Sequence, residues 1–392
     1  MNHKQKNYYP SAFVLYLNYF IHGIGASILA QQVIKDSLAV SWSTSDDKVV
    51  LVAAALGLGR LISLPFSGPL SDKMGRRISI LIGIFSYAIF FIGIALANNF
   101  IVAYLFAILG GIANSFLDTG VIPQNLEILY PRSGLASMLT KFFMSFAQLL
   151  LPFMLMIFAT KNLSYESFMV WLSVVSLILG IIIIKLPLPE KKNKISNNKS
   201  IMKSIRKTKF NKESICLILI GFTSTATFQL WLNTAQKFAV DIVNISDPSI
   251  LQKYYSFGSI VAIVITSILV TKIKEVRFLI IYPLVSLITL VSVLISKSAT
   301  VTIIGSFLIG FFAAGGVLQL ATAAVNDIFD DIKGTITSII MIFSSLSNYI
   351  MLSLAGSFSA TYGIESVMIL NIVNTLIGVI LALIVNLNYK RN

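Results

Sequence analysis

A short charged segment between two long apolar runs constrains the fold of this chain more than any other feature. The first run, residues 49–69, has Arg60 as its only charged residue, and the second, residues 78–97, has none. A helix of about 20 apolar residues is long enough to span the hydrocarbon core of a bilayer. The segment between the runs is basic, which is typical of a loop on the cytoplasmic side of a membrane. We therefore predict two membrane-spanning helices joined by a tight cytoplasmic loop.

Apolar runs of this kind recur along the whole chain. Of its 392 residues, 56% are hydrophobic and 12% are charged, whereas soluble domains have about 25% charged residues. About twelve stretches are long enough to cross a bilayer, among them residues 11–34 and residues 300–325. The sequence therefore predicts an all-α membrane protein with about twelve transmembrane helices.

The basic residues are concentrated in alternate loops, which predicts how the chain is oriented. The net charge is +14, and the cations gather at Lys4, Lys6, Lys73, Arg76, Arg77, Arg132, residues 191–212, Lys272, Lys274, Arg277, Lys333, Lys390 and Arg391. Because basic loops remain on the cytoplasmic side, both termini are expected in the cytoplasm of a cell whose cytoplasmic membrane holds the protein. Basic segments beside a membrane also attract anionic lipid. We expect no nucleic-acid partner.

A polar segment in the middle divides the chain into two halves. Residues 187–212 contain two prolines, several asparagines and a run of basic residues, which is typical of a cytoplasmic linker. We predict one six-helix bundle in residues 1–186 and another in residues 213–392, with a short amphipathic helix near residues 201–210.

The charged segment also carries a motif. Residues 68–77 read Gly-Pro-Leu-Ser-Asp-Lys-Met-Gly-Arg-Arg, which resembles the signature of loop 2–3 in the major facilitator superfamily of secondary transporters. The resemblance implies two pseudo-symmetric six-helix bundles, each built from inverted three-helix units. It also implies a substrate site at the bilayer midplane between the halves and transport by alternating access. We expect the protein to act as a monomer.

The residues of this motif suggest a conformational latch. Gly68 would allow close helix approach and Gly75 a sharp turn, while Asp72 would face a helix N-terminus. The resemblance implies that this partner is the start of the eleventh span, near residues 334–338. Arg76 and Arg77 would then face the cytoplasmic acids Asp327, Asp330 and Asp331. The alternative is an ordinary basic topology loop.

Few ionisable residues lie at membrane depth, and these usually mark a transport pathway. Arg60 is predicted near the midplane, whereas Asp118 and Lys141 lie at matching depths on the expected fourth and fifth spans, so that the two could form an ion pair. As a functional site, Asp118 would exchange a proton as Arg60 or Lys141 approaches and withdraws. As a structural site, it would form a static salt bridge. The excess of cations favours an anionic substrate, so Arg60 and Lys141 would serve as pairing cations or as anchors for the substrate anion in its cavity.

His22 lies in the middle of the first span and is a second candidate for proton handling. A lone histidine beside Gly23 and Gly25 is, however, more often a packed and hydrogen-bonded residue.

The fourth expected span has a narrower resemblance. Asp118 is followed by Thr119 and, five places after the acid, by Pro123, a pattern similar to the fucose:proton symporter branch, as is the run 139–146. This resemblance implies that Asp118 is the acid that couples transport to protons. The chain departs from that branch at Ala26 and Ser27, where an acid is expected, and at Lys141, where a neutral polar residue is usual.

Other polar residues could line a substrate cavity. The candidates are Asn18, Asn114, Gln229, Trp231, Asn233, Gln236 and Gln319. Gln229, Asn233 and Gln236 recur at helical spacing and so share one face of the seventh span. Amides and an aromatic ring suit a small polar ligand, although such amides also hydrogen-bond between helices.

The sequence disfavours other classes of function. It has no phosphate-binding loop of the ATPase type, and its two histidines and single cysteine predict neither a metal site nor a cofactor. No catalytic constellation emerges, so we do not expect an enzyme. Three hypotheses remain: proton-coupled symport of a sugar or organic acid, proton-coupled export of drugs or metabolites, and a membrane sensor that does not transport.

Overall fold

The computed structural model describes residues 8–129, 133–189, 210–270, 273, 275–329 and 333–388. Within these residues all regular secondary structure is helical. The predicted linker helix near residues 201–210 falls almost entirely outside them. Eleven helical segments of the described structure, with Ala299–Asn326 counted as one, are long and apolar enough to cross a membrane, which confirms the predicted all-α membrane fold. A further helix of 21 residues, α10 (Ser249–Leu269), is not among the eleven, and its first turns carry Gln252 and Lys253.

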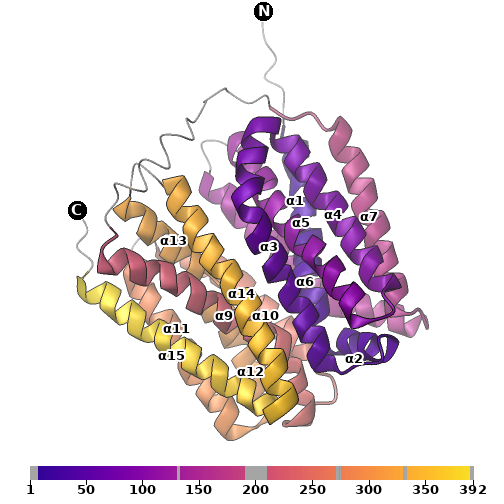
Figure 1. The fold of residues 1–392 in the computed structure, drawn as a ribbon. Coiled ribbons are helices and arrows are strands. Elements are labelled where there is room, and N and C mark those ends of the chain that lie inside the picture. The colour runs from indigo at the N-terminus through magenta and orange to yellow at the C-terminus, as the bar shows by residue number, and fades with distance from the viewer. Residues whose placement is uncertain are drawn as a thin grey trace, which may run out of the picture. The chain divides into compact units, whose positions relative to one another are not determined.

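The chain forms two compact units. The first comprises Met1–Ile28 and Gly59–Asn193. Its helices, indigo to magenta in Figure 1, are α1 (Tyr9–Ser27), the second half of α3 (Asp46–Met74), α4 (Arg76–Leu96), α5 (Phe100–Ile128), α6 (Ser133–Thr160) and α7 (Tyr165–Lys185). Within this unit α4 packs against α5 and α7, and α1 packs against α5 and α6.

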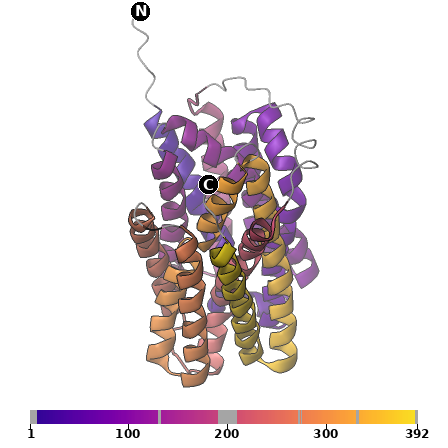
Figure 2. The same ribbon diagram turned by 90° about the vertical axis from the view of Figure 1, so that its left-hand side faces the viewer.

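The second unit comprises Leu29–Leu58 and Lys194–Asn392. It holds α2 (Gln32–Ser41), the first half of α3, α9 (Lys212–Asp241), α10, α11 (Glu275–Ser296), α12 (Ala299–Ile309), η2 (Gly310–Ala314), α13 (Val317–Ile328), α14 (Lys333–Tyr362) and α15 (Ile364–Asn388). The long helix α9 packs against α14 and α15, and α11 also packs against α15. These helices lie side by side in Figure 2.

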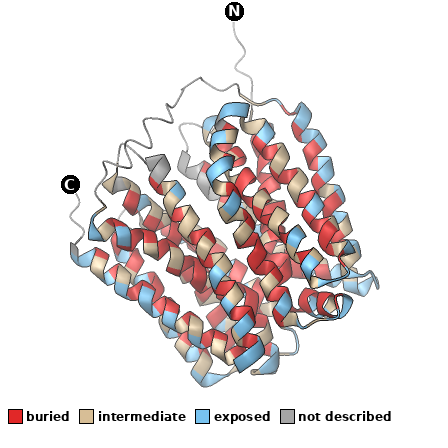
Figure 3. Cartoon of the chain, in the orientation of Figure 1, coloured by how far each residue is buried: buried red, intermediate tan, exposed pale blue. Residues whose placement is uncertain are grey.

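Burial divides each helix into an inner and an outer face (Figure 3). In the first unit Tyr87, Phe90 and Phe91 are fully buried and their rings contact one another. Large apolar residues such as Ile181 and Val373 are instead exposed. An apolar outer face and an intact helical backbone are what a lipid-facing helix requires.

The first span ends earlier than predicted. The sequence suggested one helix over residues 11–34, but α1 ends at Ser27, a short 3-10 turn follows (Ile28–Ala30), and α2 begins at Gln32. Gln31 has an extended backbone, and the backbone N–H of Gln32 donates to Oε1 of Gln236 at 2.7 Å. A side chain thus supplies the acceptor that a continuous helix would have provided, which explains the break.

The tenth span is also interrupted. Between α12 and α13 the chain forms the single π-helical turn η2, followed by Gly315 and Gly316, and Gly316 has a positive φ of 152°. Such π-turns often occur at functional sites. The predicted continuous span over residues 300–325 is therefore two helices joined at a bend.

The charged hairpin is tighter than the sequence suggested. Helix α3 continues through Gly68 to Met74, and α4 begins at Arg76. The only residue between them is Gly75, whose φ of 95° confirms the predicted turn glycine. At Gly68, where a close helix approach is predicted, a Cβ would meet no atom within 4 Å among the described residues.

Candidate functional site

A buried ion pair between Arg60 and Asp118 forms the centre of the first unit's polar site. Nη2 of Arg60 lies 2.7 Å from Oδ2 of Asp118, and the two side chains are only 23% and 17% exposed. Arg60 lies 14 residues after the start of α3 and 14 before its end, or about 21 Å from either end of the helix. The pair therefore lies inside the membrane-spanning part of the unit.

Hydroxyl contacts hold α3 against α5 about two and three helical turns after Arg60. Oγ of Ser67 lies 2.8 Å from Oγ of Ser115, and Oγ of Ser71 donates to the carbonyl oxygen of Thr119 at 2.8 Å. Small polar side chains allow such close contact between membrane helices. These contacts fix the rotation of α3 on which the Arg60 contact with α5 depends.

A tyrosine that the sequence analysis did not select completes the shell of Asp118. The hydroxyl of Tyr19 on α1 donates to Oδ1 of Asp118 at 2.6 Å. Each carboxylate oxygen thus has its own partner, Arg60 on one and Tyr19 on the other. A possible signal was the spacing of Tyr19 and His22, because residues three apart lie on the same face of a helix.

His22 lies beside this shell, and the hydrogen bonds to the Asp118 carboxylate come from Tyr19 and Arg60 instead. Its ring stacks on Tyr19 with centroids 5.2 Å apart and planes 7° apart, and it lies 6.0 Å from the ring of Tyr87. His22 is 6% exposed, and its Nδ1 has no hydrogen-bond partner among the described residues. The imidazole is therefore packed, but one buried nitrogen remains open to a ligand or water.

Asn114 contacts Tyr87, an aromatic residue whose ring lies near His22. It accepts a hydrogen bond at Oδ1 from the hydroxyl of Tyr87. Tyr87 in turn packs against Gly25 so closely that a Cβ at Gly25 would lie 2.3 Å from the ring. This close approach explains why α1 has a glycine at that position.

Lys141 on α6 is the second cation of this unit, and the structure pairs Asp118 with Arg60 instead. Lys141 interacts electrostatically with Asp118 and Arg60, but it forms no ion pair with any described residue. The ion pair between Lys141 and Asp118 considered from the sequence is therefore absent from the described structure. The unit therefore places one acidic and two basic side chains here.

Asn18 and Gln319, two of the predicted cavity residues, lie apart from this network. Asn18 is fully buried, and its Nδ2 donates to the carbonyl oxygen of Val14 one turn earlier in α1. Gln319 lies on α13 in the second unit and is partly buried. The structure assigns neither of them to the contacts around Asp118.

The predicted polar face of α9 lies in the second unit. Nδ2 of Asn233 donates to the backbone oxygen of Gln229 at 2.9 Å and to its side-chain oxygen at 3.3 Å. Oε1 of Gln236 accepts from the backbone of Gln32. Trp231 is buried and lines a small pocket with Gln236 and five other residues of α9 and α10. Hydrogen bonds between helices, the alternative considered from the sequence, thus account for Gln236.

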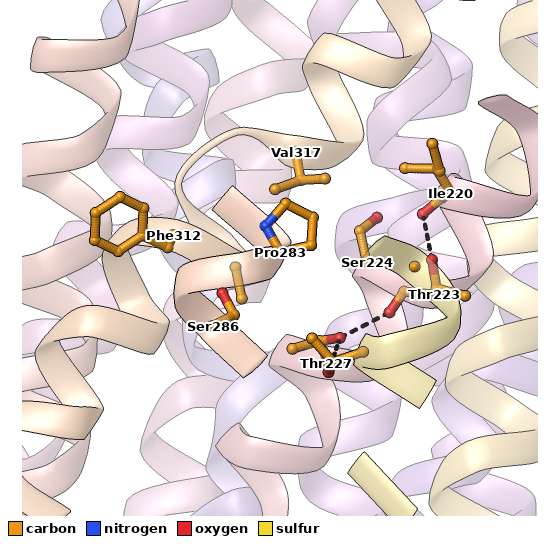
Figure 4. Close-up of a pocket in the computed structure, with 11 residues that line it drawn as sticks. Ile220, Thr223, Ser224, Thr227, Pro283, Ser286, Phe312 and Val317 are labelled. Atoms are coloured by element: carbon orange, nitrogen blue, oxygen red, sulfur yellow. Dashed lines mark hydrogen bonds between the residues drawn. The ribbon is translucent and has the colours of Figure 1, made fainter. Parts of the chain in front are cut away.

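The second unit contains another pocket beside the bend of the tenth span, which the sequence analysis did not find. It is lined by Ile220, Thr223, Ser224 and Thr227 of α9, Pro283 and Ser286 of α11, Phe312 and Ala313 of η2, Val317 of α13, and Thr375 and Gly378 of α15 (Figure 4). The Thr227 and Thr375 hydroxyls lie 2.8 Å apart. Gly315–Gly316 was the signal that could have indicated this bend.

The latch residues are only partly described. Nη1 of Arg76 donates to Oγ of Ser71 at 3.0 Å, and Nη2 of Arg77 donates to the carbonyl oxygen of Leu186 at 2.6 Å. Both arginines thus contact groups of their own unit. The side chains of the acids named for the latch, Asp72, Asp327, Asp330 and Asp331, lie outside the described residues.

Comparison with known proteins decides the family. The family model described as Major Facilitator Superfamily matches residues 9–252 and 248–391. The chain belongs to this superfamily. It is 31% identical over 380 residues to the inner membrane transport protein YdiN of Escherichia coli (strain K12), a match that covers 96% of this chain and 90% of that protein. It is therefore a transport protein and not an enzyme, and it is a multi-pass protein of the cell membrane.

Two further matches bear on the fold and on one segment. The crystal structure of a D-xylose-proton symporter superposes with a TM-score of 0.78 at 15% identity, covering 98% of this chain and 99% of that chain. This likeness shows the shared fold. The quinolone resistance protein NorA of Staphylococcus aureus is 33% identical over 111 residues, which is 28% of this chain.

Proposed function

We propose that this major facilitator carries a small polar or anionic metabolite, a sugar or an organic acid, together with protons, and that Asp118 is the residue that exchanges the proton. The contact that supports the proposal best is the buried pair of Asp118 and Arg60, with Tyr19 on the second carboxylate oxygen. A carboxylate at this depth carries a large desolvation cost, so its charge depends on its cationic partner. Movement of Arg60 away from Asp118 would favour proton uptake, and its return would favour release.

The arrangement of charges favours a substrate with an acidic group. Arg60 forms an ion pair with Asp118, whereas Lys141 has no ion-pair partner among the described residues. A cation without a carboxylate partner at membrane depth suits an anionic ligand. We therefore assign Lys141 to substrate binding, with His22 and Asn114 as neighbouring polar groups.

Two other parts of the proposal rest on the sequence pattern. Lys73, Arg76 and Arg77 lie at the junction of α3 and α4, which favours a cytoplasmic position for that hairpin and for both termini. The latch remains a proposal in which Asp72 faces the first turn of the eleventh span. We also propose that the protein acts as a monomer.

Proton-coupled export is the second candidate. It is favoured by the match of 111 residues to NorA, whose name links that protein to quinolone resistance. The same protonation cycle serves either direction, because a carrier that exchanges a proton for substrate uses the same carboxylate as one that carries both together.

A two-stage experiment tests the proposal. Purified protein is first screened by thermal shift against sugars, organic acids and quinolones at about pH 6 and about pH 8. The compound that stabilises it most is then radiolabelled and used in proteoliposomes. Wild-type protein should accumulate the compound under a proton gradient, and Asp118→Asn should lose accumulation while it still exchanges compound across the membrane. Gradient-driven accumulation by Asp118→Asn would refute the role of Asp118.

A further inference from the structure

A second group of charged side chains lies in the second unit, where the start of α3 meets α9. Nζ of Lys237 lies 2.8 Å from Oδ1 of Asp46 and 2.9 Å from Oδ1 of Asp47. All three side chains are at most 20% exposed. One ammonium thus joins two carboxylates in the first turn of α3 to the end of α9.

Helix α2 adds further contacts to the same place. Nζ of the fully buried Lys35 donates to the carbonyl oxygen of Asn233 at 2.8 Å. Nε2 of Gln32 donates to Asp36 at 2.7 Å and to Asp46 at 3.2 Å. We refer to Lys35, Asp36, Asp46, Asp47 and Lys237 as the α2–α9 charge cluster.

Four members of the cluster lie on a segment of the second unit that is joined at both ends to chain of the first unit. Leu29–Leu58 groups with the second unit, but the chain before it continues from α1 and the chain after it continues into the second half of α3. The change of unit occurs within α3 itself, between Leu58 and Gly59. The contacts of the cluster are therefore among those that determine which unit this segment packs with.

The chemistry of the cluster favours reversible attachment over permanent packing. Buried ion pairs seldom stabilise a protein more than apolar side chains of the same volume would, so static packing gives little reason to place Lys237 against Asp46 and Asp47. Asp46 and Asp47 occupy the first turn of α3, and Lys237 lies four residues before the end of α9. Charges near helix ends can regain water when they separate, unlike charges in the middle of a span.

The burial of the Lys35 ammonium also favours separation of α2 from α9. Burial lowers the pKa of Lys35 to about 8, although Asp46 acts in the opposite direction. An ammonium group at this position is therefore disfavoured relative to the same group in water.

We propose that the α2–α9 charge cluster is a reversible lock, in which Lys237 leaves Asp46 and Asp47, and Lys35 leaves the Asn233 carbonyl, during each transport cycle. Opening the lock frees α2 and the first turns of α3 from α9, so that Leu29–Leu58 can move with the helices to which it is joined. The lock does not depend on Asp118, on the substrate or on the coupling ion.

Electron–electron distance measurements on detergent-solubilised full-length protein test the lock. Spin labels are placed on Val40 of α2 and Val240 of α9, which are 82% and 40% exposed, after Cys216→Ser removes the native cysteine. Labelled protein that keeps all the charges of the cluster should show one dominant distance between the two labels. Lys237→Gln, and separately Asp46→Asn with Asp47→Asn, should add a population at longer distance.

Two further variants test whether charge alone is responsible. Lys237→Arg keeps the cation and should keep the dominant distance. The triple variant Asp46→Asn, Asp47→Lys and Lys237→Asp reverses one ion pair and should recover it. An added long-distance population that reversal does not remove would overturn the proposal, as would unchanged distances in both neutralised variants.

The matched control breaks a different ion pair of the same unit. Nζ of Lys297 lies 2.7 Å from Oε1 of Glu365, but these side chains are 46% and 39% exposed. Lys297→Gln should leave the distance between the labels unchanged, and an equal shift would contradict a specific lock. If neutralised variants fail to fold, raising the salt concentration on labelled wild-type protein replaces them. Salt weakens the ion pairs and should enlarge the long-distance population, whereas no response to salt would overturn the lock.

Discussion

The charged groups around Asp118 and around Lys237 have ion pairs of nearly equal length but lie at different positions along their helices. Asp118 and Arg60 lie 2.7 Å apart near the middle of long spans, whereas Lys237 lies 2.8 and 2.9 Å from two aspartates at helix ends. In the middle of a span a carboxylate that loses its cation has little access to water, so it is expected to take up a proton. At a helix end the same separation is compensated by hydration. Similar geometry therefore suits proton exchange in the first unit and reversible attachment in the second.

The largest expected difference between the two sites is in coupling. Asp118→Asn should reduce proton-driven accumulation to the level of empty vesicles, because an amide cannot carry the proton. Asp47→Asn, which alters the other cluster, should change the rate of transport but keep accumulation above that level. The measurement is uptake of the radiolabelled compound by proteoliposomes with a pH gradient. Equal loss in both variants would remove the distinction between the sites.

Removing the cation of the first site should produce the next largest effect. Arg60→Gln leaves Asp118 with Tyr19 as its hydrogen-bonding partner and should reduce the free energy of unfolding by about 3 kcal/mol at neutral pH. Lowering the pH should recover much of the lost stability, because protonation of Asp118 removes the negative charge that has lost its partner. Thermal unfolding in detergent at about pH 5 and about pH 8 measures both effects. The double variant with Asp118→Asn should show little dependence on pH, and a loss that persisted in acid would contradict this explanation.

The second site should respond to alkaline pH. Burial lowers the pKa of Lys35 from 10.5 to about 8, so the folded protein binds fewer protons than the unfolded chain between these values. Stability should therefore rise with pH in that window, by up to about 3 kcal/mol from this residue. Below about pH 8 the cost of the buried ammonium is fully present. Asp36, Asp46, Asp47 and Lys237 act on the same group.

The test of this pH dependence is a comparison with Lys35→Met, which keeps the apolar stem and removes the titrating group. The free energy of unfolding of the wild type should rise more steeply than that of the variant between about pH 8 and about pH 10. Identical slopes would mean that Lys35 is not buried as a cation.

The smallest expected effect concerns the hydroxyl on Asp118. Tyr19→Phe keeps the ring stacked on His22 but removes the donor to Oδ1, and should cost about 1.5 kcal/mol of stability. Tyr16→Phe is the matched control, because the Tyr16 hydroxyl donates at 3.1 Å to the neutral carbonyl oxygen of Ala136. A smaller loss for Tyr19→Phe than for Tyr16→Phe, measured by thermal unfolding, would contradict the role of Tyr19.

Hydropathy was enough to predict the membrane fold, and the depth of charges along the spans was enough to select Asp118, Arg60 and Lys141. These two patterns could not identify the cation that pairs with Asp118. That pairing depends on how each helix is rotated about its axis, and helices with apolar residues on most faces give no sequence signal for this rotation. In the structure Ser67 and Ser71 help to set that rotation for α3.

The breaks in the helices could not be predicted from the pattern of apolar runs either. The start of α2 depends on a contact from Gln236, which lies 204 residues away from Gln32 in the sequence. The bend at Gly316 depends on a backbone conformation with positive φ. Lys35 and Lys237 were missed because charges near the ends of spans resemble ordinary loop charges.

The central claim is that Asp118 changes its protonation state, and infrared difference spectroscopy tests it without a substrate. Spectra of wild-type protein in lipid are recorded between about pH 5 and about pH 9, and those of Asp118→Asn are subtracted. The account predicts a carbonyl band of a protonated carboxylic acid that appears on acidification in wild type and is missing from Asp118→Asn, but is retained in Asp47→Asn. Identical pH-dependent spectra for wild type and Asp118→Asn would contradict it.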